Sequence, residues 1–111
     1  MKFSERNLRR CEAPNGFNHK LDSWTLSDWM TATLGELGEA ANIVTKLNRV
    51  RDGIPGNTEN KEELKEKLKE ELADVYIYLD LMVQAVGLDL DVIVEEKFNR
   101  TSAKIGYAEE E

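Results

Sequence analysis

Residues 61–86 read KEELKEKLKEELADVYIYLDLMVQAV and carry the clearest structural signal in the chain. Their apolar residues recur at intervals of three or four, which is the period of a helix buried along one face. These residues are Leu64, Leu68, Leu72, Val75, Leu79, Met82 and Val86. Asn60 and Glu63 have the spacing of an N-terminal capping box, and Gly87 is typical of a C-terminal stop. The sequence therefore predicts a long helix over residues 61–86.

A second long helix is predicted before it, over about residues 26–49, with Thr25 or Ser27 as the N-cap. We expect its core-facing stripe to consist of Met30, Leu34, Leu37, Ala41, Val44 and Leu47. Shorter helices are expected over residues 3–12 and, after Asp89, over residues 90–104. No run alternates long enough between apolar and polar residues to predict a strand. The expected fold is an all-α four-helix bundle.

Length and composition narrow the class of protein further. The 111 residues suit one domain over 1–111, and we expect the tail 108–111 to be frayed. A net charge of −7 argues against nucleic acid bound through its phosphates. No apolar run approaches the ~20 residues of a membrane span, so no membrane partner is expected. The N-terminus lacks the apolar segment of a signal peptide and Cys11 is the one cysteine, which together favour the cytoplasm.

Two pairs of acidic residues stand out on the two long predicted helices. Glu36 and Glu39 are three residues apart, as are Glu71 and Asp74, so each pair shares a helix face. If the helices pack antiparallel, all four carboxylates converge at the seam. Two like charges at about 4 Å cost on the order of 4 kcal/mol at an effective dielectric of 20, so convergence requires cations or shared protons. Carboxylate oxygens on rigid helices suit Mg²⁺ or Mn²⁺, whereas the alternative interpretation is a pair of solvated helix faces.

Two further features bear on this candidate site. Gly35 and Gly38 each cost about 1 kcal/mol inside a helix, and we expect them to admit the close approach of another helix or a ligand. A di-iron bundle would need a Glu-x-x-His motif on each of two helices. The single histidine, His19, precedes the long helices, so the sequence does not favour that class of site.

Three segments together resemble a known family. They are WMTATLGELGEAAN at residues 29–42, ELADVYIYL at 71–79 and KFNRTS at 97–102. In this combination the chain is similar, over residues 17–107, to the MazG-like all-α nucleoside triphosphate pyrophosphohydrolases. It is similar to the short single-domain members, including those close to dCTP pyrophosphatases, rather than to the long tandem-domain form.

The resemblance implies a reaction and a set of site residues. The reaction is Mg²⁺-dependent hydrolysis of a (d)NTP to the (d)NMP and pyrophosphate, a house-cleaning activity for which Mn²⁺ can replace Mg²⁺, with dCTP as the favoured substrate. The family's metal-ligand positions fall on Glu36, Glu39, Glu71 and Asp74, and Glu36 or Glu39 is the expected general base. The implied nucleotide contacts are Lys46, Tyr78, Lys97, Asn99, Trp24 and His19. For the two lysines a solvated surface position, for Tyr78 a place in the core and for His19 an ordinary loop position remain alternative interpretations.

The resemblance also implies a homo-oligomer, either a dimer or a dimer-of-dimers tetramer, with the active site completed at a subunit interface. The predicted helix over residues 61–86 is apolar on more sides than one small bundle covers. We expect Tyr76, Ile77, Leu81 and Val83 to pack across that interface. A second hypothesis for the function is a non-catalytic helical oligomerisation module with a vestigial divalent-metal site.

Overall fold

The computed structural model describes residues 1–109, and this part of the chain is all-α, with no strand. Its elements are α1 (Phe3–Glu12), the 3₁₀ turn η1 (Leu21–Ser23), α2 (Leu26–Arg51), α3 (Lys61–Ala85) and α4 (Leu90–Ile105). The four expected helices are therefore confirmed, with ends within two residues of the predicted ones. The expected frayed tail lies partly outside the described residues, at positions 110 and 111.

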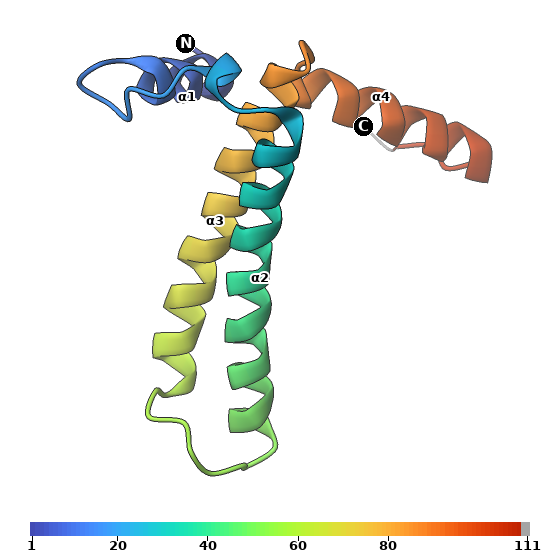
Figure 1. Ribbon diagram of the computed structural model, residues 1–111. Helices are drawn as coiled ribbons and strands as arrows, with labels where there is room; N and C mark the ends of the chain where they lie inside the picture. The colour runs from blue at the N-terminus through green and yellow to red at the C-terminus, as the bar shows by residue number, and fades with distance from the viewer. Residues whose placement is uncertain (110–111) are drawn as a thin grey trace.

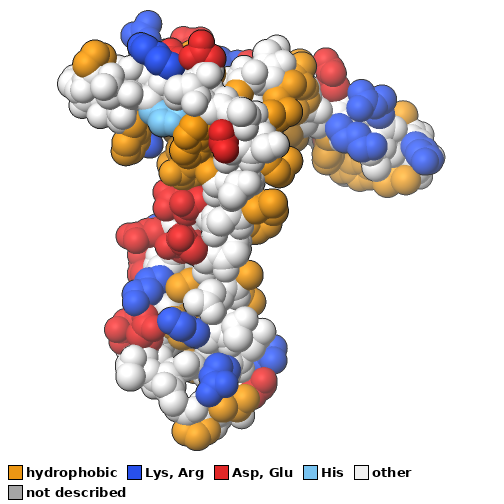
Figure 2. All heavy atoms as spheres, viewed as in Figure 1, with side chains coloured by type: hydrophobic (Ala, Val, Ile, Leu, Met, Phe, Trp, Pro, Cys, Tyr) orange, Lys and Arg blue, Asp and Glu red, His pale blue; other side chains and the backbone are white. Residues whose placement is uncertain are grey.

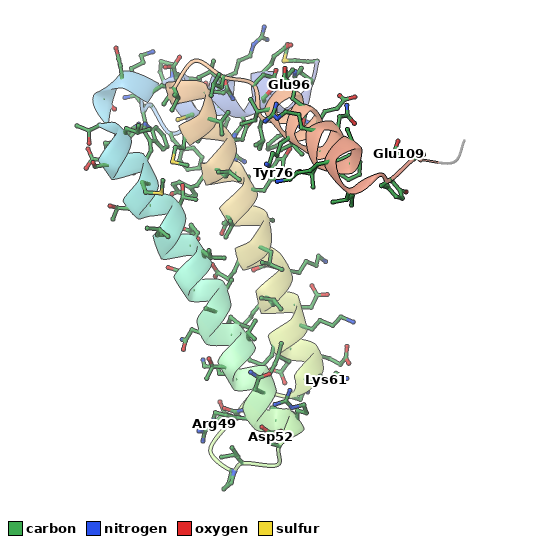
Figure 3. The ribbon with its side chains drawn as sticks, turned by 90° about the vertical axis from the view of Figure 1, so that its right-hand side faces the viewer. Arg49, Asp52, Lys61, Tyr76, Glu96 and Glu109 are labelled. Carbon is green, nitrogen blue, oxygen red and sulfur yellow. The ribbon has the colours of Figure 1, made fainter. Side chains whose placement is uncertain are left out.

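The two long helices form an antiparallel hairpin, and the two short helices lie at one end of it (Figure 1). The loop between Asp52 and Lys61 is at the opposite end, as Figure 3 shows from the side. Among the described elements α4 packs against α3 alone, and it projects away from the hairpin. The single chain is thus an extended hairpin with two lateral helices, measuring 47 × 47 × 27 Å, and its helices do not close into a compact bundle.

The helix ends follow the capping chemistry that the sequence indicates. Thr25 and Asp28 form a reciprocal capping box at the start of α2, and Asn60 and Glu63 form one at the start of α3. Gly87 has a φ of +82°, a left-handed conformation that only glycine adopts readily after a helix end. These caps fix the start of both long helices and therefore the register in which their acidic pairs can meet.

The main core lies where α1, α2 and α3 meet. Cys11, Trp29 and Leu81 are buried against one another there. Leu81 and Val83 are both covered within the chain, so the expectation that they pack across a subunit interface is wrong. The short helix α1 provides this cover for Leu81, which the sequence did not indicate. Tyr76 remains exposed.

The face of α2 that meets α3 differs from the predicted one. Its buried residues are Trp29, Thr33, Ala40 and Ile43, with Glu36 half-buried between them. The predicted stripe is wrong: Leu34 is 58% exposed, Leu37 is 49% exposed, and Met30 and Val44 are exposed as well. Small residues such as Thr33 and Ala40 suit a close helix pair, so the larger side chains are left on the outer face.

The two glycines of α2, Gly35 and Gly38, have open space where a side chain would lie. A Cβ built on Gly35 or Gly38 would meet no atom within 4 Å among the described residues. The close approach expected at these positions is therefore absent within the chain. None of the described helices is both long and apolar enough to cross a membrane.

A buried polar network attaches α1 to α3. Asn7 donates hydrogen bonds from Nδ2 to Asp80 Oδ2 at 2.9 Å and to the Ile77 carbonyl at 3.0 Å. Gln84 donates from Nε2 to the same Asp80 oxygen and to the Ser4 carbonyl, both at 2.9 Å. Asn7 is 3% exposed and Asp80 1%, so the bond between these two side chains lies out of water. They hold α1 in place as one wall of the cavity described below.

Candidate functional site

Three carboxylates from the two long helices meet at the middle of the hairpin. Oxygen atoms of Glu36 on α2 and of Glu71 and Asp74 on α3 all lie within 4.8 Å of one another. Glu36 occupies the buried seam of α2, one turn beyond Thr33 and one turn before Ala40. The antiparallel convergence expected from the sequence is confirmed for these three residues.

The carboxylates perturb one another's protonation. Contact with the Glu39 carboxyl, burial and the surrounding negative charges raise the pKa of Glu71 from 4.5 to about 7. Burial, followed by the charges of Glu39 and Asp74, raises the pKa of Glu36. Glu39 itself is exposed, and it borders the cluster through its contact with Glu71. All four predicted ligand positions therefore interact, with Glu39 at the open side.

The donor set fits a hard divalent cation. Oε2 of Glu71 is buried and has no hydrogen-bond partner in the part of the chain that is described. A buried polar atom without a partner is costly, and a cation would satisfy it. Carboxylate oxygens alone, with no nitrogen or sulfur donor in the cluster, are the ligands that Mg²⁺ and Mn²⁺ prefer.

A cavity of about 420 Å³ adjoins the cluster and shares Glu36 and Asp74 with it. Its other lining residues are Asn7, Arg10, Cys11, Phe17, His19, Trp24, Trp29, Ile77, Tyr78 and Leu81. In Figure 2 the acidic side chains of the hairpin lie directly below a hydrophobic patch beside the molecule's one histidine. The volume is within the range of small-molecule sites. One end of the site is thus acidic and the other aromatic.

The aromatic end is built from the loop before α2. The His19 ring lies 4.5 Å from that of Trp24 and 5.6 Å from that of Trp29, and the two Trp rings are 4.8 Å apart, all edge to face. The indole N–H of Trp29 donates to the Leu21 carbonyl at 3.0 Å, which fixes this ring in the core. Trp24 and His19, both predicted nucleotide contacts, therefore do line the cavity.

Backbone hydrogen bonds hold the preceding loop against α1. Phe17 donates to the Arg10 carbonyl and His19 to the Cys11 carbonyl, at 2.9 and 2.8 Å. At Gly16 a Cβ would lie 2.1 Å from the Arg10 carbonyl oxygen, so only glycine permits this turn. The wall carrying Phe17 and His19 is consequently preformed.

Of the other predicted nucleotide contacts, one lines the cavity and three do not. Tyr78 lines the cavity, where burial and then the charges of Glu36 and Asp74 raise its pKa. Lys46 pairs with Glu59 at 3.6 Å, toward the α2–α3 loop, and does not line the cavity. Lys97 and Asn99 are exposed on α4 and are absent from the cavity lining too.

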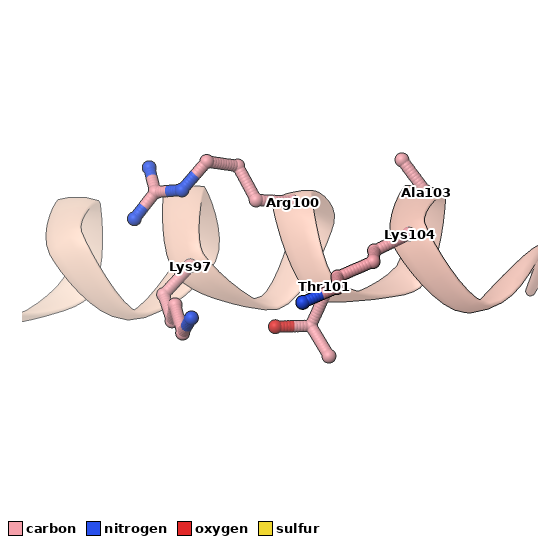
Figure 4. A pocket seen from close by; sticks show the side chains of 5 residues that line it. All are labelled: Lys97, Arg100, Thr101, Ala103 and Lys104. Atoms are coloured by element: carbon pink, nitrogen blue, oxygen red, sulfur yellow. The ribbon is translucent and has the colours of Figure 1, made fainter.

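A shallow hollow on α4 contains one of these residues. Figure 4 shows Lys97 there together with Arg100 and Lys104, on a helix that touches only α3 among the described elements. This basic strip is not part of the acidic site within one chain.

Several lining residues were not foreseen from the sequence, among them polar residues of α1. Asn7 and Arg10 come from α1, which the pattern marks as a short and weak helix. The available signal is that Asn7 and Cys11 are four residues apart and buried on one face, which directs this side of α1 inward. No model of a known protein family matches the chain, and neither a curated protein nor a solved structure matches it.

Proposed function

We propose that this protein hydrolyses nucleoside triphosphates to the monophosphate and pyrophosphate with Mg²⁺ as cofactor. The observation that carries the proposal is that a cation-fitting carboxylate cluster adjoins an aromatic cavity, with Glu36 and Asp74 common to both. A nucleotide has the same two-part chemistry, an anionic phosphate chain that binds through metal and a planar base that stacks on aromatic rings. The resemblance to the MazG-like family supports the same reaction.

Glu36, Glu71 and Asp74 would hold the metal, with Glu39 beside them. When bound, Mg²⁺ supplies neutralisation of phosphate charge and activation of water for attack on phosphorus. Glu36 or Glu39 accepts the proton of the attacking water as the α-phosphorus–oxygen bond to the pyrophosphate breaks. Trp24 and His19 hold the base, and Tyr78, which lines the same cavity, contacts the sugar.

A second copy of the chain completes the site in this proposal. The outer face of α2 presents an exposed apolar stripe with Met30, Leu34 and Leu37, and α4 carries exposed Phe98. Large contiguous apolar faces favour association. The basic strip of α4 is complementary in charge to the acidic cluster, so a partner's α4 is the source of the family's lysine and asparagine contacts. The assembly is a dimer or a dimer of dimers, acting on the cytoplasmic nucleotide pool.

The direct test is pyrophosphate release from a panel of dNTPs with and without Mg²⁺. Asp74→Asn keeps the size of the side chain but removes a ligand charge. Mutations around metal ligands commonly cost 10- to 100-fold, so loss of a ligand itself should lower turnover more than about 100-fold. Glu70→Gln, an exposed neighbour on α3, is the matched control and should leave turnover unchanged. Parental turnover by Asp74→Asn, or no Mg²⁺-dependent release from any dNTP, would refute the proposal.

The alternative function is a helical oligomerisation module without catalysis. The exposed stripe on α2 favours it, because that face fits a partner helix whether or not the site is active. The two hypotheses differ in the dNTP panel: the module assembles but releases no pyrophosphate. Assembly alone therefore does not distinguish them, and turnover does.

A further inference from the structure

We propose that Arg10 reads the edge of the base and restricts the substrate to nucleotides of cytosine or guanine. This inference rests on the proposed function, because it takes the cavity to hold the base of a nucleotide whose phosphates lie at the carboxylates. Arg10 lies on α1 and belongs neither to the carboxylate cluster nor to the ring contacts of His19, Trp24 and Trp29.

Arg10 is held in position but its donors are free. Its guanidinium carbon lies 5.3 Å from the centroid of the Phe17 ring, a cation–π contact. The Phe17 amide bonds to the Arg10 carbonyl at 2.9 Å, so ring and guanidinium are tied to the same turn. Within residues 1–109 the Arg10 side chain forms no ion pair and donates no hydrogen bond. Arg10 is exposed and lines the cavity, so its guanidinium has donors to offer to a ligand that binds there.

Three of the other lining donors are engaged, whereas the Trp24 indole and the Tyr78 hydroxyl are neutral donors. The Asn7 amide donates to Asp80 and the Ile77 carbonyl. The Trp29 indole donates to the Leu21 carbonyl, and the Cys11 thiol to the His19 carbonyl at 3.1 Å. Arg10 is the one arginine or lysine that the described chain contributes to this lining. At this wall, a base bound in the cavity would therefore meet a charged group that only donates hydrogen bonds and so pairs only with acceptor atoms.

The guanidinium fork discriminates among bases because it offers two parallel N–H groups. Cytosine presents N3 and O2 side by side, and guanine presents O6 and N7, so each can accept both bonds. Adenine places its amino group next to N7 and next to N1. Thymine and uracil place an N3–H between their carbonyls. These bases offer the fork a single acceptor, and a donor would be left unpaired.

The experiment measures selectivity in two ways. Hydrolysis of the four dNTPs gives ratios of kcat/KM, and tryptophan fluorescence titrated with the four deoxynucleoside monophosphates, without metal, gives ratios of Kd. Arg10→Lys keeps the charge and loses the fork, and Arg10→Ala loses both. Arg9→Ala, on the same helix and outside the cavity lining, is the control.

We expect the parent and Arg9→Ala to prefer cytosine or guanine nucleotides over those of adenine and thymine. Both Arg10 variants should lower this preference roughly 5- to 150-fold, the value of one bidentate contact. An equal loss for all four bases would overturn the proposal and indicate a phosphate contact. A parent that prefers adenine or thymine, or a preference unchanged in Arg10→Lys, would overturn it as well.

The binding measurement separates this inference from the proposed function. If no dNTP is hydrolysed but monophosphate selectivity is present and is lost in Arg10→Lys, the reading of the base by Arg10 stands and the pyrophosphohydrolase proposal fails. If dNTPs are hydrolysed and the Arg10 variants keep parental selectivity, the reverse holds. If no nucleotide is bound or hydrolysed, both are refuted.

Discussion

Replacement of Asn7 by alanine tests whether the buried polar network fixes α1 on the hairpin. With ten residues, α1 is too short to be a stable helix alone, so it depends on its contacts with the rest of the chain. Asn7 supplies one hydrogen bond to the Asp80 carboxylate and one to the Ile77 carbonyl. Asn7→Ala removes both and leaves Asp80, which is 1% exposed, with the Gln84 amide as its remaining donor in this network.

The size of the effect follows from these two bonds. A hydrogen bond to a charged group contributes about 1.5–3 kcal/mol and one to a neutral group about 0.5–1.5 kcal/mol. The Ile77 carbonyl lies within α3 and keeps its helical partner, so we expect a total loss of about 2–3 kcal/mol. The unfolding entropy of a 111-residue chain is roughly 0.23 kcal/mol/K, which converts this loss to a fall in Tm of about 9–13 °C.

The assay is urea and thermal unfolding followed by circular dichroism at one fixed protein concentration, because an oligomer's stability depends on concentration. A double-mutant cycle with Asp80→Ala isolates the pairwise coupling between Asn7 and Asp80. We expect a coupling of about 1.5 kcal/mol or more. A loss below about 1 kcal/mol for Asn7→Ala, or strict additivity in the cycle, would refute the reasoning that this network holds α1.

Three further predictions concern the acidic site and the outer face of α2. Mg²⁺ should raise Tm by about 12 °C at a hundredfold excess over its Kd, since binding to the native state then contributes about 2.7 kcal/mol; an unchanged Tm against an EDTA sample would contradict a cation site. In EDTA the contribution of Glu71 to stability should be fully present below pH 4.5, because its pKa is raised in the fold, and should be lost as the pH rises through about 7. Glu71→Gln should flatten this profile in melts recorded across that range. Light scattering should give at least a dimer, and Leu34→Glu, which places a charge in the exposed apolar stripe, should shift the mass toward one chain; a monomeric parent would refute the association.

Helix positions and ends were predictable because they depend on local chemistry. The capping box of Asn60 with Glu63 and the left-handed Gly87 act within a few residues, so the pattern in the sequence suffices to place them. The convergence of Glu36 with Glu71 and Asp74 was predictable for a similar reason. It follows from two helices joined by a short loop and from acidic pairs at matching distances from that loop.

The direction in which α2 faces was not predictable from periodicity. Both the stripe through Leu34 and Leu37 and the stripe through Trp29, Glu36 and Ala40 recur with helical spacing. Choosing the stripe with more large apolar residues gave the wrong face. Periodicity alone does not distinguish contacts within a chain from contacts between chains. It also assigns leucine rather than glutamate to the buried face, although here Glu36 is half-buried and Leu34 is exposed.

The contribution of α1 to the site could not be found from motifs either. Asn7 and Arg10 reach the cavity because the network through Asp80 and the turn at Gly16 fold α1 and its loop back on the hairpin. Asn7 and Asp80 are 73 positions apart in the sequence, and Gly16 follows Arg10 by six. Neither has a repeating spacing that marks it in the sequence.

The location of the carboxylates explains why the site and the fold constrain each other. Glu36 and Glu71 lie in the seam between α2 and α3, so their like charges act directly on the contact that holds the hairpin together. The aromatic core at one end, around Trp29, and the ion pairs of Glu59 with Lys46 and Lys67 at the other hold the two helices on either side of this repulsion. A cation at the seam would offset this repulsion. The proposed cofactor therefore acts on stability and chemistry through the same three oxygen-bearing side chains, which is why the melts and the turnover assay should depend on Mg²⁺ over the same concentration range.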